Sequence, residues 1–186
     1  MKKLIHEEIQ RIRLTEAEAA SAAKRFPVIA ILDNIRSLYN VGSIFRTSDG
    51  ARIEAIYTVG YTPHPPRPEI EKTALGATRT VPTRHFENMG DAITAARDLG
   101  FGVCALELTD SSRSVYDLAE ADFPMALIVG NEITGVSREA LELIDFAIDI
   151  PMLGAKHSLN VSVAYGVCLY EALRVFRGRS EAFLPQ

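Results

Sequence analysis

Length and composition predict one soluble globular domain, because the chain has 186 residues of which 47% are hydrophobic and 24% are charged. The formal net charge of −4 argues against a strongly cationic nucleic-acid binder, but it hides a net +3 over residues 1–90 and −7 over residues 91–186. No apolar run is long enough for a membrane helix, and the charged start of the chain lacks the apolar core of a signal peptide.

The predicted elements alternate between helices and strands after a helical start. The first 25 residues are predicted to be helical, with a second start at Thr15, where Glu18 completes a capping box before an alanine-rich run. Continuous apolar runs predict strands buried on both faces, at residues 28–32, 53–59, 102–106, 126–129 and 146–150, with a shorter one near 80–82. Helices are predicted at residues 41–50, 91–99, 137–144 and 159–177. This alternation predicts an α/β fold with a mostly parallel sheet flanked by helices.

One long segment, residues 60–77, has no predicted element. Four prolines between Pro63 and Pro68 stiffen it and remove sheet hydrogen bonds. A loop of this length in a compact domain more often covers or lines a site, although a proline-rich stretch also suits a proline-binding partner.

Cysteine and histidine positions bear on redox state and metal binding. Cys104 and Cys168 lie far apart within apolar segments, so we expect reduced core residues of a cytoplasmic protein. The 4 histidines show no metal-ligand spacing, and we therefore expect no metal site.

Polar turns follow three of the predicted strands, and none contains the G-x-G-x-x-G pattern of a dinucleotide site. The first turn leads into NVGSIFRT from Asn40, the second is VGNEITGVS from Val129, and the third is IPMLGAKHSLNVSVA from Ile150. In the third, a strand end, a loop with Gly154 and a helix start leave backbone groups without partners inside the elements. That arrangement suits a small ligand.

Together, in this order and each at a strand end, the three motifs resemble those of the SpoU (TrmH-like) RNA ribose 2′-O-methyltransferases of the SPOUT superfamily. The resemblance covers residues 28–177, and KTALGAT at residues 72–78 is similar to a loop after the second strand in this family. It implies a C-terminal trefoil knot, an exception to the rule that chains avoid knots. It divides the chain into an N-terminal helical extension (residues 1–27) and a SPOUT methyltransferase domain (residues 28–186). It also implies a homodimer that completes each active site, with helices 41–50 and 159–177 at the interface.

The same resemblance implies S-adenosyl-L-methionine as cofactor, bent within the knot. The implied cofactor-binding positions are Leu106, Gly130, Ile150, Met152, Ser158 and Leu159. The implied catalytic positions are Arg46, Asn40, Glu132, Ser158 and Asn160, with Arg46 supplied by the partner subunit. Because an arginine stays protonated, we expect Arg46 to clamp the phosphate beside the reacting ribose and to stabilise the developing alkoxide. The substrate phosphate then takes the proton.

Each of these catalytic positions also has a structural interpretation. Ser158 and Asn40 suit helix caps, and Arg46 suits a surface ion pair. Glu132 suits either a hydrogen-bonded tie of its loop or an orienting group for Arg46. Asn160 inside a first helical turn is unusual unless its amide has a partner, which favours a site role.

Other side chains bear on the RNA. Tyr39 and Phe45 offer rings for base stacking but are expected to pack, and His157 is expected to be an ordinary loop residue. A basic face for phosphates has candidates that are otherwise solvated charges: Arg36, Arg46, Arg52, Arg67, Lys72, Arg79 and Arg84. Residues 1–27 are too short for a separate RNA-recognition domain. The family resemblance implies that a helical extension then grips structured RNA, here through Arg11, Arg13, Lys24 and Arg25.

Three functions stay open at this point. The first is methyl transfer to a ribose 2′-hydroxyl in transfer or ribosomal RNA. The second is non-catalytic RNA binding on the same scaffold, and the intact set of polar motif positions counts against it. The third is a small-molecule α/β enzyme, which the acidic net charge suggests and the absence of a phosphate or dinucleotide loop opposes.

Overall fold

A parallel sheet forms the centre of the protein in a computed structural model that describes residues 1–11, 14–20 and 25–177. It is a 7-stranded sheet with the strand order β3-β2-β1-β6-β4-β7-β5, and its paired strands are parallel. The strands are β1 Phe26–Asp33, β2 Ile53–Val59, β3 Thr83–Phe86, β4 Gly102–Leu106, β5 Arg113–Ser114, β6 Met125–Val129 and β7 Phe146–Asp149. The helices are α1 His6–Arg11, α2 Glu16–Ala20, α3 Leu38–Ala51, α4 Pro68–Ala74, α5 Met89–Asp98, α6 Arg138–Leu141 and α7 Val161–Arg177. Short 3-10 turns are η1 Ala77–Arg79, η2 Val115–Asp117 and η3 Glu120–Asp122.

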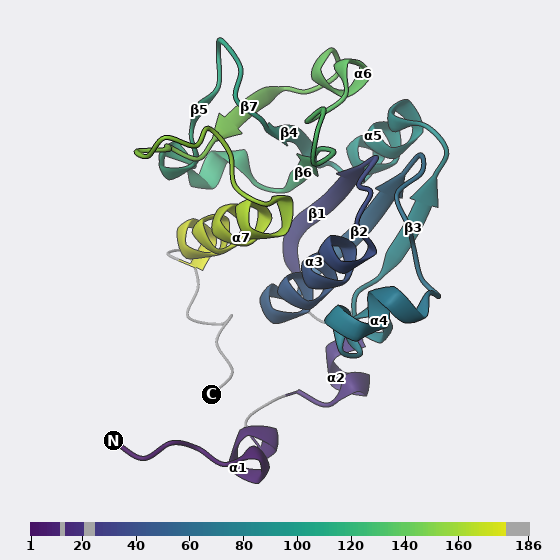
Figure 1. Ribbon diagram of the computed structural model, residues 1–186, viewed down its shortest axis with the longest axis vertical. Helices are drawn as coiled ribbons and strands as arrows, with labels where there is room; N and C mark the ends of the chain where they lie inside the picture. Colours follow the sequence, from purple (N-terminus) through teal and green to yellow (C-terminus); the bar gives the residue numbers. More distant parts are fainter. Residues whose placement is uncertain (12–13, 21–24, 178–186) are drawn as a thin grey trace.

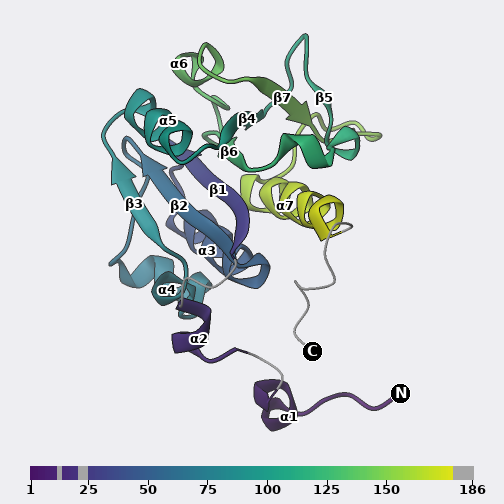
Figure 2. The same ribbon diagram turned by 180° about the vertical axis from the view of Figure 1, so that it is seen from behind.

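Both faces of the sheet are buried, which explains why the strands are continuous apolar runs. Along β1, Val28, Ala30 and Leu32 belong to one hydrophobic core, whereas Ile29 and Ile31 belong to the other. Helices α3, α4 and α7 cover the first face, and α5 and α6 cover the second, as Figures 1 and 2 show from opposite sides. The predicted α/β architecture, a mostly parallel sheet flanked by helices, is therefore confirmed.

The two longest helices begin at residues other than those predicted. Helix α3 begins at Leu38, because Ser37 caps it by accepting a hydrogen bond from the N–H of Asn40. Helix α7 begins at Val161, and Asn160 just before it accepts a hydrogen bond from the N–H of Ser162. Asn40 and Ser158 are therefore not the caps that the sequence suggested.

Two predictions in the middle of the chain need correction. The short strand predicted near residues 80–82 is present as the edge strand β3, but it begins at Thr83, because the chain is still leaving η1 at residues 80–82. The proline-rich segment is not wholly irregular, since it holds helix α4. This helix starts with Pro68 in its first turn, where a missing N–H leaves no intrahelical bond unmade.

The N-terminal segment forms short helices, and α1 stands clear of the sheet in Figures 1 and 2. The capping box is present, because the N–H of Thr15 donates to Glu18 and the N–H of Glu18 donates to the Thr15 hydroxyl. The alanine-rich run begins in α2, and its continuation at residues 21–24 lies outside the described residues. No helix in the described ranges has the length and apolar character needed to cross a bilayer.

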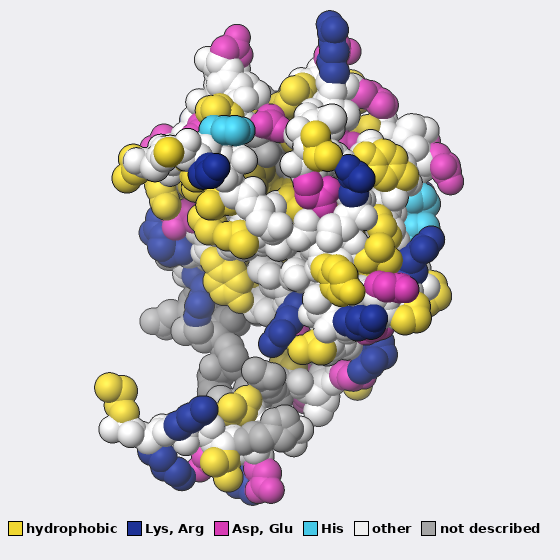
Figure 3. Space-filling view, in the orientation of Figure 1, with side chains coloured by type: hydrophobic (Ala, Val, Ile, Leu, Met, Phe, Trp, Pro, Cys, Tyr) yellow, Lys and Arg dark blue, Asp and Glu magenta, His cyan; other side chains and the backbone are white. Residues whose placement is uncertain are grey.

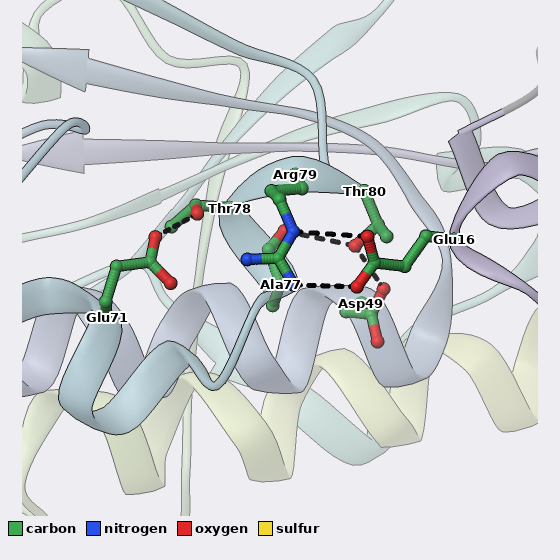
Figure 4. Close-up of polar contacts among 7 residues, drawn as sticks. All are labelled: Glu16, Asp49, Glu71, Ala77, Thr78, Arg79 and Thr80. Carbon is green, nitrogen blue, oxygen red and sulfur yellow. Dashed lines mark hydrogen bonds and ion pairs between the residues drawn. The ribbon is translucent and has the colours of Figure 1, made fainter.

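Helix α2 is held against the rest of the protein by arginines. The guanidinium of Arg79 donates to both carboxylate oxygens of Glu16, at 3.1 and 2.7 Å (Figure 4). Arg25 donates to the carbonyl of Ala19, and also to the carbonyls of Ile53 and Thr80. These contacts assign Arg79 and Arg25 a structural part in fixing the extension.

Candidate functional site

The carboxyl ends of β6, β4 and β7 meet at one edge of the sheet, because these parallel strands are neighbours. Leu106 at the end of β4 is in register with Val129 of β6 and Ile148 of β7. Gly130 and Ile150, which follow those strands, therefore lie on either side of it. The structure thus brings together three of the predicted cofactor-binding positions from separate parts of the chain.

Gly130 sits in a turn that has no room for a side chain. A Cβ atom on Gly130 would lie 2.2 Å from the backbone carbon of Gly135 and 2.2 Å from the nitrogen of Val136. The turn is closed by backbone hydrogen bonds between Asn131 and Gly135, at 2.9 and 3.0 Å. Close backbone packing within the turn therefore explains why glycine stands here.

The loop of residues 151–159 is the open side of the site. Ser158 and Leu159 are exposed, and Met152 is half-buried beside Ile150. Among the residues that the structure describes, none forms a hydrogen bond with this loop, whether through backbone or side-chain atoms. Its N–H and C=O groups are therefore available to a ligand.

Asn40, Glu132 and Asn160, which are far apart in the sequence, form one hydrogen-bonded cluster. The amide of Asn40 donates to a carboxylate oxygen of Glu132 at 2.8 Å, and the amide of Asn160 donates to the Asn40 carbonyl at 3.2 Å. Glu132 also accepts the backbone N–H groups of Arg36 and Ser37, at 2.9 and 3.1 Å. Glu132 thus ties its own loop to the start of α3.

The same hydrogen bonds keep Glu132 ionised. Partial burial, the largest single influence, raises the pKa of Glu132, but the donors from Arg36, Asn40 and Ser37 together hold that pKa below its ordinary value. An ionised carboxylate only accepts hydrogen bonds, which fixes the Asn40 amide nitrogen toward Glu132 and leaves the Asn40 carbonyl facing Asn160. The cluster is therefore held together by its own side chains and by the backbone at the start of α3.

Arg46 lies apart from this cluster within one chain. It is six residues beyond Asn40 on α3, which places it ~9 Å along the helix axis and ~120° around it. The Arg46 side chain is exposed and makes no hydrogen bond or ion pair with any residue that the structure describes. Arg46 therefore does not form the surface ion pair that the sequence allowed with any described residue. Its side chain also makes no hydrogen bond or ion pair with Glu132.

Two carboxylates in this region, one buried and one half-buried, were missed by sequence reasoning. Asp33, which is 1% exposed, accepts the N–H of Ser137 at 2.7 Å, and Glu107 accepts the N–H of Val136 at 2.8 Å. Asp33 ends β1 and Glu107 follows β4, so an acidic residue at the end of an apolar strand was the available signal. Both hold the turn of the second motif in place.

A cavity of about 600 Å³ lies elsewhere, beside the edge strand β3. Its lining includes Thr78 and Thr80, whose hydroxyls already donate to Glu71 and Asp49 (Figure 4). The cavity lining contains none of the predicted catalytic or cofactor-binding residues, although it includes Arg25 and Arg79 from the RNA-binding candidates. Within the described ranges, no His, Cys, Asp and Glu side chains are grouped to hold a metal ion.

The comparisons with known proteins identify the family of the chain. Residues 27–170 match the SpoU rRNA Methylase family, and the chain belongs to that family. A Staphylococcus saprophyticus protein described as a TrmH family tRNA/rRNA methyltransferase is 30% identical over 153 residues, which are 82% of this chain and 61% of that protein. A Staphylococcus haemolyticus protein of the same description is 33% identical over 146 residues, covering 78% and 58%. The chain thus spans about three fifths of the length of these relatives.

Solved structures share the fold over most of the chain. The TrmH/SpoU tRNA modifying enzyme of A. aeolicus aligns with a TM-score of 0.75 and 30% identity, covering 93% of this chain and 84% of that one. An rRNA methyltransferase of Sinorhizobium meliloti, solved with AdoMet bound, aligns with a TM-score of 0.75 and 29% identity, covering 84% and 59%.

Proposed function

We propose that this protein transfers a methyl group from S-adenosyl-L-methionine to a ribose 2′-hydroxyl in transfer or ribosomal RNA. The observation that carries the proposal is the convergence of three distant motifs, in a member of the SpoU family, on one edge of the sheet. There a pre-arranged polar cluster (Asn40, Glu132 and Asn160) stands beside a loop whose backbone is open to a ligand.

The residues at the sheet edge fit the cofactor. The unpaired backbone groups of residues 151–159 suit the edges of a nucleoside, and the half-buried Leu106, Ile150 and Met152 suit its apolar faces. Gly130, Ser158 and Leu159 complete the proposed binding set. The bound cofactor supplies an electrophilic methyl group on a sulfonium, and the Sinorhizobium meliloti neighbour was solved with AdoMet.

The protein's own residues position the ribose hydroxyl and stabilise the negative charge that develops on its oxygen. A ribose hydroxyl is a weak nucleophile near neutral pH, and holding it in line supplies up to about 7–11 kcal/mol in favourable cases. Asn40 and Asn160 present fixed polar groups for this purpose, and Ser158 adds a hydroxyl from the open loop. Arg46 clamps the adjacent phosphate in its fork and stabilises the developing alkoxide, while the substrate phosphate takes the proton.

A second copy of the chain is part of the proposal. Val163, Val167 and Tyr170 lie on one face of α7 and are 52%, 37% and 51% exposed, and Figure 3 shows hydrophobic side chains gathered over α7. A homodimer through α3 and α7 buries this stripe. It also brings the unpartnered Arg46 of one subunit to the polar cluster of the other.

The remaining expectations rest on the family resemblance. We propose that residues 130–132 and 150–160 lie in a C-terminal trefoil knot, and that a helical extension of residues 1–27 precedes a methyltransferase domain of residues 28–186. Localisation in the cytoplasm is supported by two free, buried cysteines, Cys104 and Cys168.

One assay tests the proposed function. The purified protein is given S-adenosyl-L-methionine with a labelled methyl group and, separately, total transfer RNA and ribosomal RNA from a strain lacking the gene. We expect label at a single ribose, detected as a phosphodiester that resists alkaline cleavage. Label on a base contradicts ribose specificity, and cofactor binding without transfer to either RNA favours non-catalytic RNA binding.

A further inference from the structure

An exposed tyrosine, Tyr61, stands next to the polar cluster without belonging to any of the three motifs. It is 62% exposed, yet its hydroxyl accepts a hydrogen bond from the Asn131 amide at 2.9 Å. Asn131 directly precedes Glu132, whose carboxylate binds Asn40. The tip of the Tyr61 ring is therefore anchored to the loop of the second motif, while much of the side chain faces solvent.

The Asn131 amide that holds the Tyr61 ring is fully used. Its nitrogen also donates to the carbonyl of Asn34 at 2.8 Å, and its oxygen accepts the N–H groups of Ile133 and Thr134 at 2.8 and 3.1 Å. Asn131 is 7% exposed, so this network is shielded from water. The anchor of Tyr61 is thus as rigid as the turn that contains it.

The backbone around Tyr61 is fixed as well. The N–H of Tyr61 donates to the side-chain oxygen of Asn34 at 3.3 Å. Gly60 before it has φ +60, and a Cβ there would lie 2.3 Å from that same oxygen. Thr62 after it is 1% exposed and donates to the carbonyl of Leu32 at 2.9 Å. Tyr61 is therefore held on both sides and at its tip.

We propose that Tyr61 is a stacking platform for a nucleobase of the RNA, next to the nucleotide whose ribose reacts. An exposed aromatic ring that is already ordered loses little entropy when a base stacks on it, and every base offers a π-face. The other candidate rings are less suited, because Phe45 is fully buried and the Tyr39 hydroxyl has no hydrogen bond with a described residue. This proposal rests on the proposed function, since it takes RNA as the substrate.

The chain contains no tryptophan, which allows a direct test by fluorescence. Tyr61→Trp places the single indole on the proposed platform, and Tyr116→Trp is the matched control, because Tyr116 in η2 is 60% exposed. Each variant is titrated with total transfer RNA, with ribosomal RNA, and with S-adenosyl-L-methionine alone. We expect RNA to quench the indole at position 61, with no quenching at position 116 and none by the cofactor alone.

Truncation of the ring gives a second, independent readout. Tyr61→Ala is expected to weaken RNA binding by about 5- to 150-fold. Tyr61→Phe is expected to stay within about threefold of the wild type, because it keeps the stacking face. Calorimetry with S-adenosyl-L-methionine is expected to give the same affinity for both variants and the wild type.

Each contrary result has a distinct meaning. RNA that binds without quenching position 61, or a Tyr61→Phe variant as weak as Tyr61→Ala, overturns the platform and leaves the methyltransferase proposal intact. Quenching by the cofactor alone also overturns it, because the ring then stacks on adenine. A wild-type protein that binds neither RNA overturns the proposed function and the platform together.

Discussion

Two sides of the site differ in how many of their polar groups are hydrogen-bonded within one chain. On the closed side, Asn131, Glu132, Asp33 and Glu107 have their hydrogen bonds made by neighbouring turns. On the open side, neither residues 151–159 nor the Arg46 side chain forms a hydrogen bond with a described residue, and α7 exposes an apolar stripe. Changes on the closed side are therefore expected to lower stability, and changes on the open side to lower activity or assembly.

Arg46→Ala is expected to have the largest effect, on the open side. Turnover should fall about 10²- to 10³-fold, as for loss of one group that stabilises a transition-state anion. Affinity for S-adenosyl-L-methionine and the melting temperature should stay unchanged, and Arg46→Lys should also be poor because it lacks the planar fork. Single-turnover kinetics measure this, with the exposed Arg138→Ala as control. A fully active Arg46→Ala enzyme would show that Arg46 has no such role.

Mixed dimers sharpen the same prediction. Subunits carrying Arg46→Ala and subunits carrying Asn40→Ala are each expected to be inactive alone. When they are mixed, activity should return, because a mixed dimer has one site with both residues intact if Arg46 comes from the partner. No recovery in demonstrably mixed dimers argues that Arg46 acts within its own subunit.

Gly130→Ala probes the closed side. The new Cβ meets the backbone of Gly135 and Val136 at 2.2 Å, so we expect a loss of about 3 kcal/mol in the free energy of unfolding. Gly154→Ala is the matched control, because a Cβ there meets no atom within 4 Å. Urea denaturation of the two variants measures the difference. Equal midpoints would show that the turn yields easily.

Val167→Asp probes assembly on the open side. A charge in the middle of the exposed α7 stripe should raise the dimer dissociation constant by at least about tenfold, because it must be desolvated in the interface. Leu108→Asp, at a residue that is 67% exposed on the loop after β4, should leave the dimer intact. Sedimentation velocity distinguishes the two. A monomeric wild type, or a dimer that tolerates Val167→Asp, contradicts the proposed interface.

Asn160 lies where the open loop of residues 151–159 meets the start of α7, and Asn160→Ala tests its role as the cap of that helix. Loss of the cap on α7 should cost about 1 kcal/mol in the free energy of unfolding. Ser158→Ala, two residues earlier in the open loop, should change stability by less than about 0.5 kcal/mol. Thermal unfolding of both variants checks the order, and a reversed order means that Ser158 is the cap after all.

The smallest expected effect is the pH dependence of the Glu132 tie. Because its pKa is lowered on folding, Glu132 adds stability above the ordinary carboxyl pKa, and this is lost as the pH falls through the lowered value. We expect the melting temperatures of wild type and Glu132→Gln to differ at neutral pH, by an amount equivalent to ~0.5 kcal/mol, and to converge in acid. A difference that does not shrink as the pH falls below the ordinary carboxyl range means that charge does not underlie the tie.

Sequence patterns located the sheet better than the contacts of the site. β2 and β4 have their predicted bounds because apolar residues predominate in both, although β2 also contains Glu54 and Thr58. Caps were misplaced, because several polar residues near a helix start compete for the same N–H groups. Strand β3 begins at Thr83, just after its predicted position. The motifs pointed to Asn40, Glu132 and Asn160 separately, but their hydrogen bonds join residues about a hundred positions apart and depend on the tertiary fold. Tyr61 gave no signal, because only its anchored hydroxyl sets it apart from an ordinary surface ring.

The exposed ion pair between Arg79 and Glu16 has a consequence for measuring RNA affinity. Both side chains are more than half exposed, so added salt weakens this pair and loosens α2 from the domain. The same salt weakens any contact between arginines and phosphates. A salt titration of RNA binding therefore reports both events at once. Repeating it with Glu16→Gln separates detachment of the extension from loss of phosphate contacts.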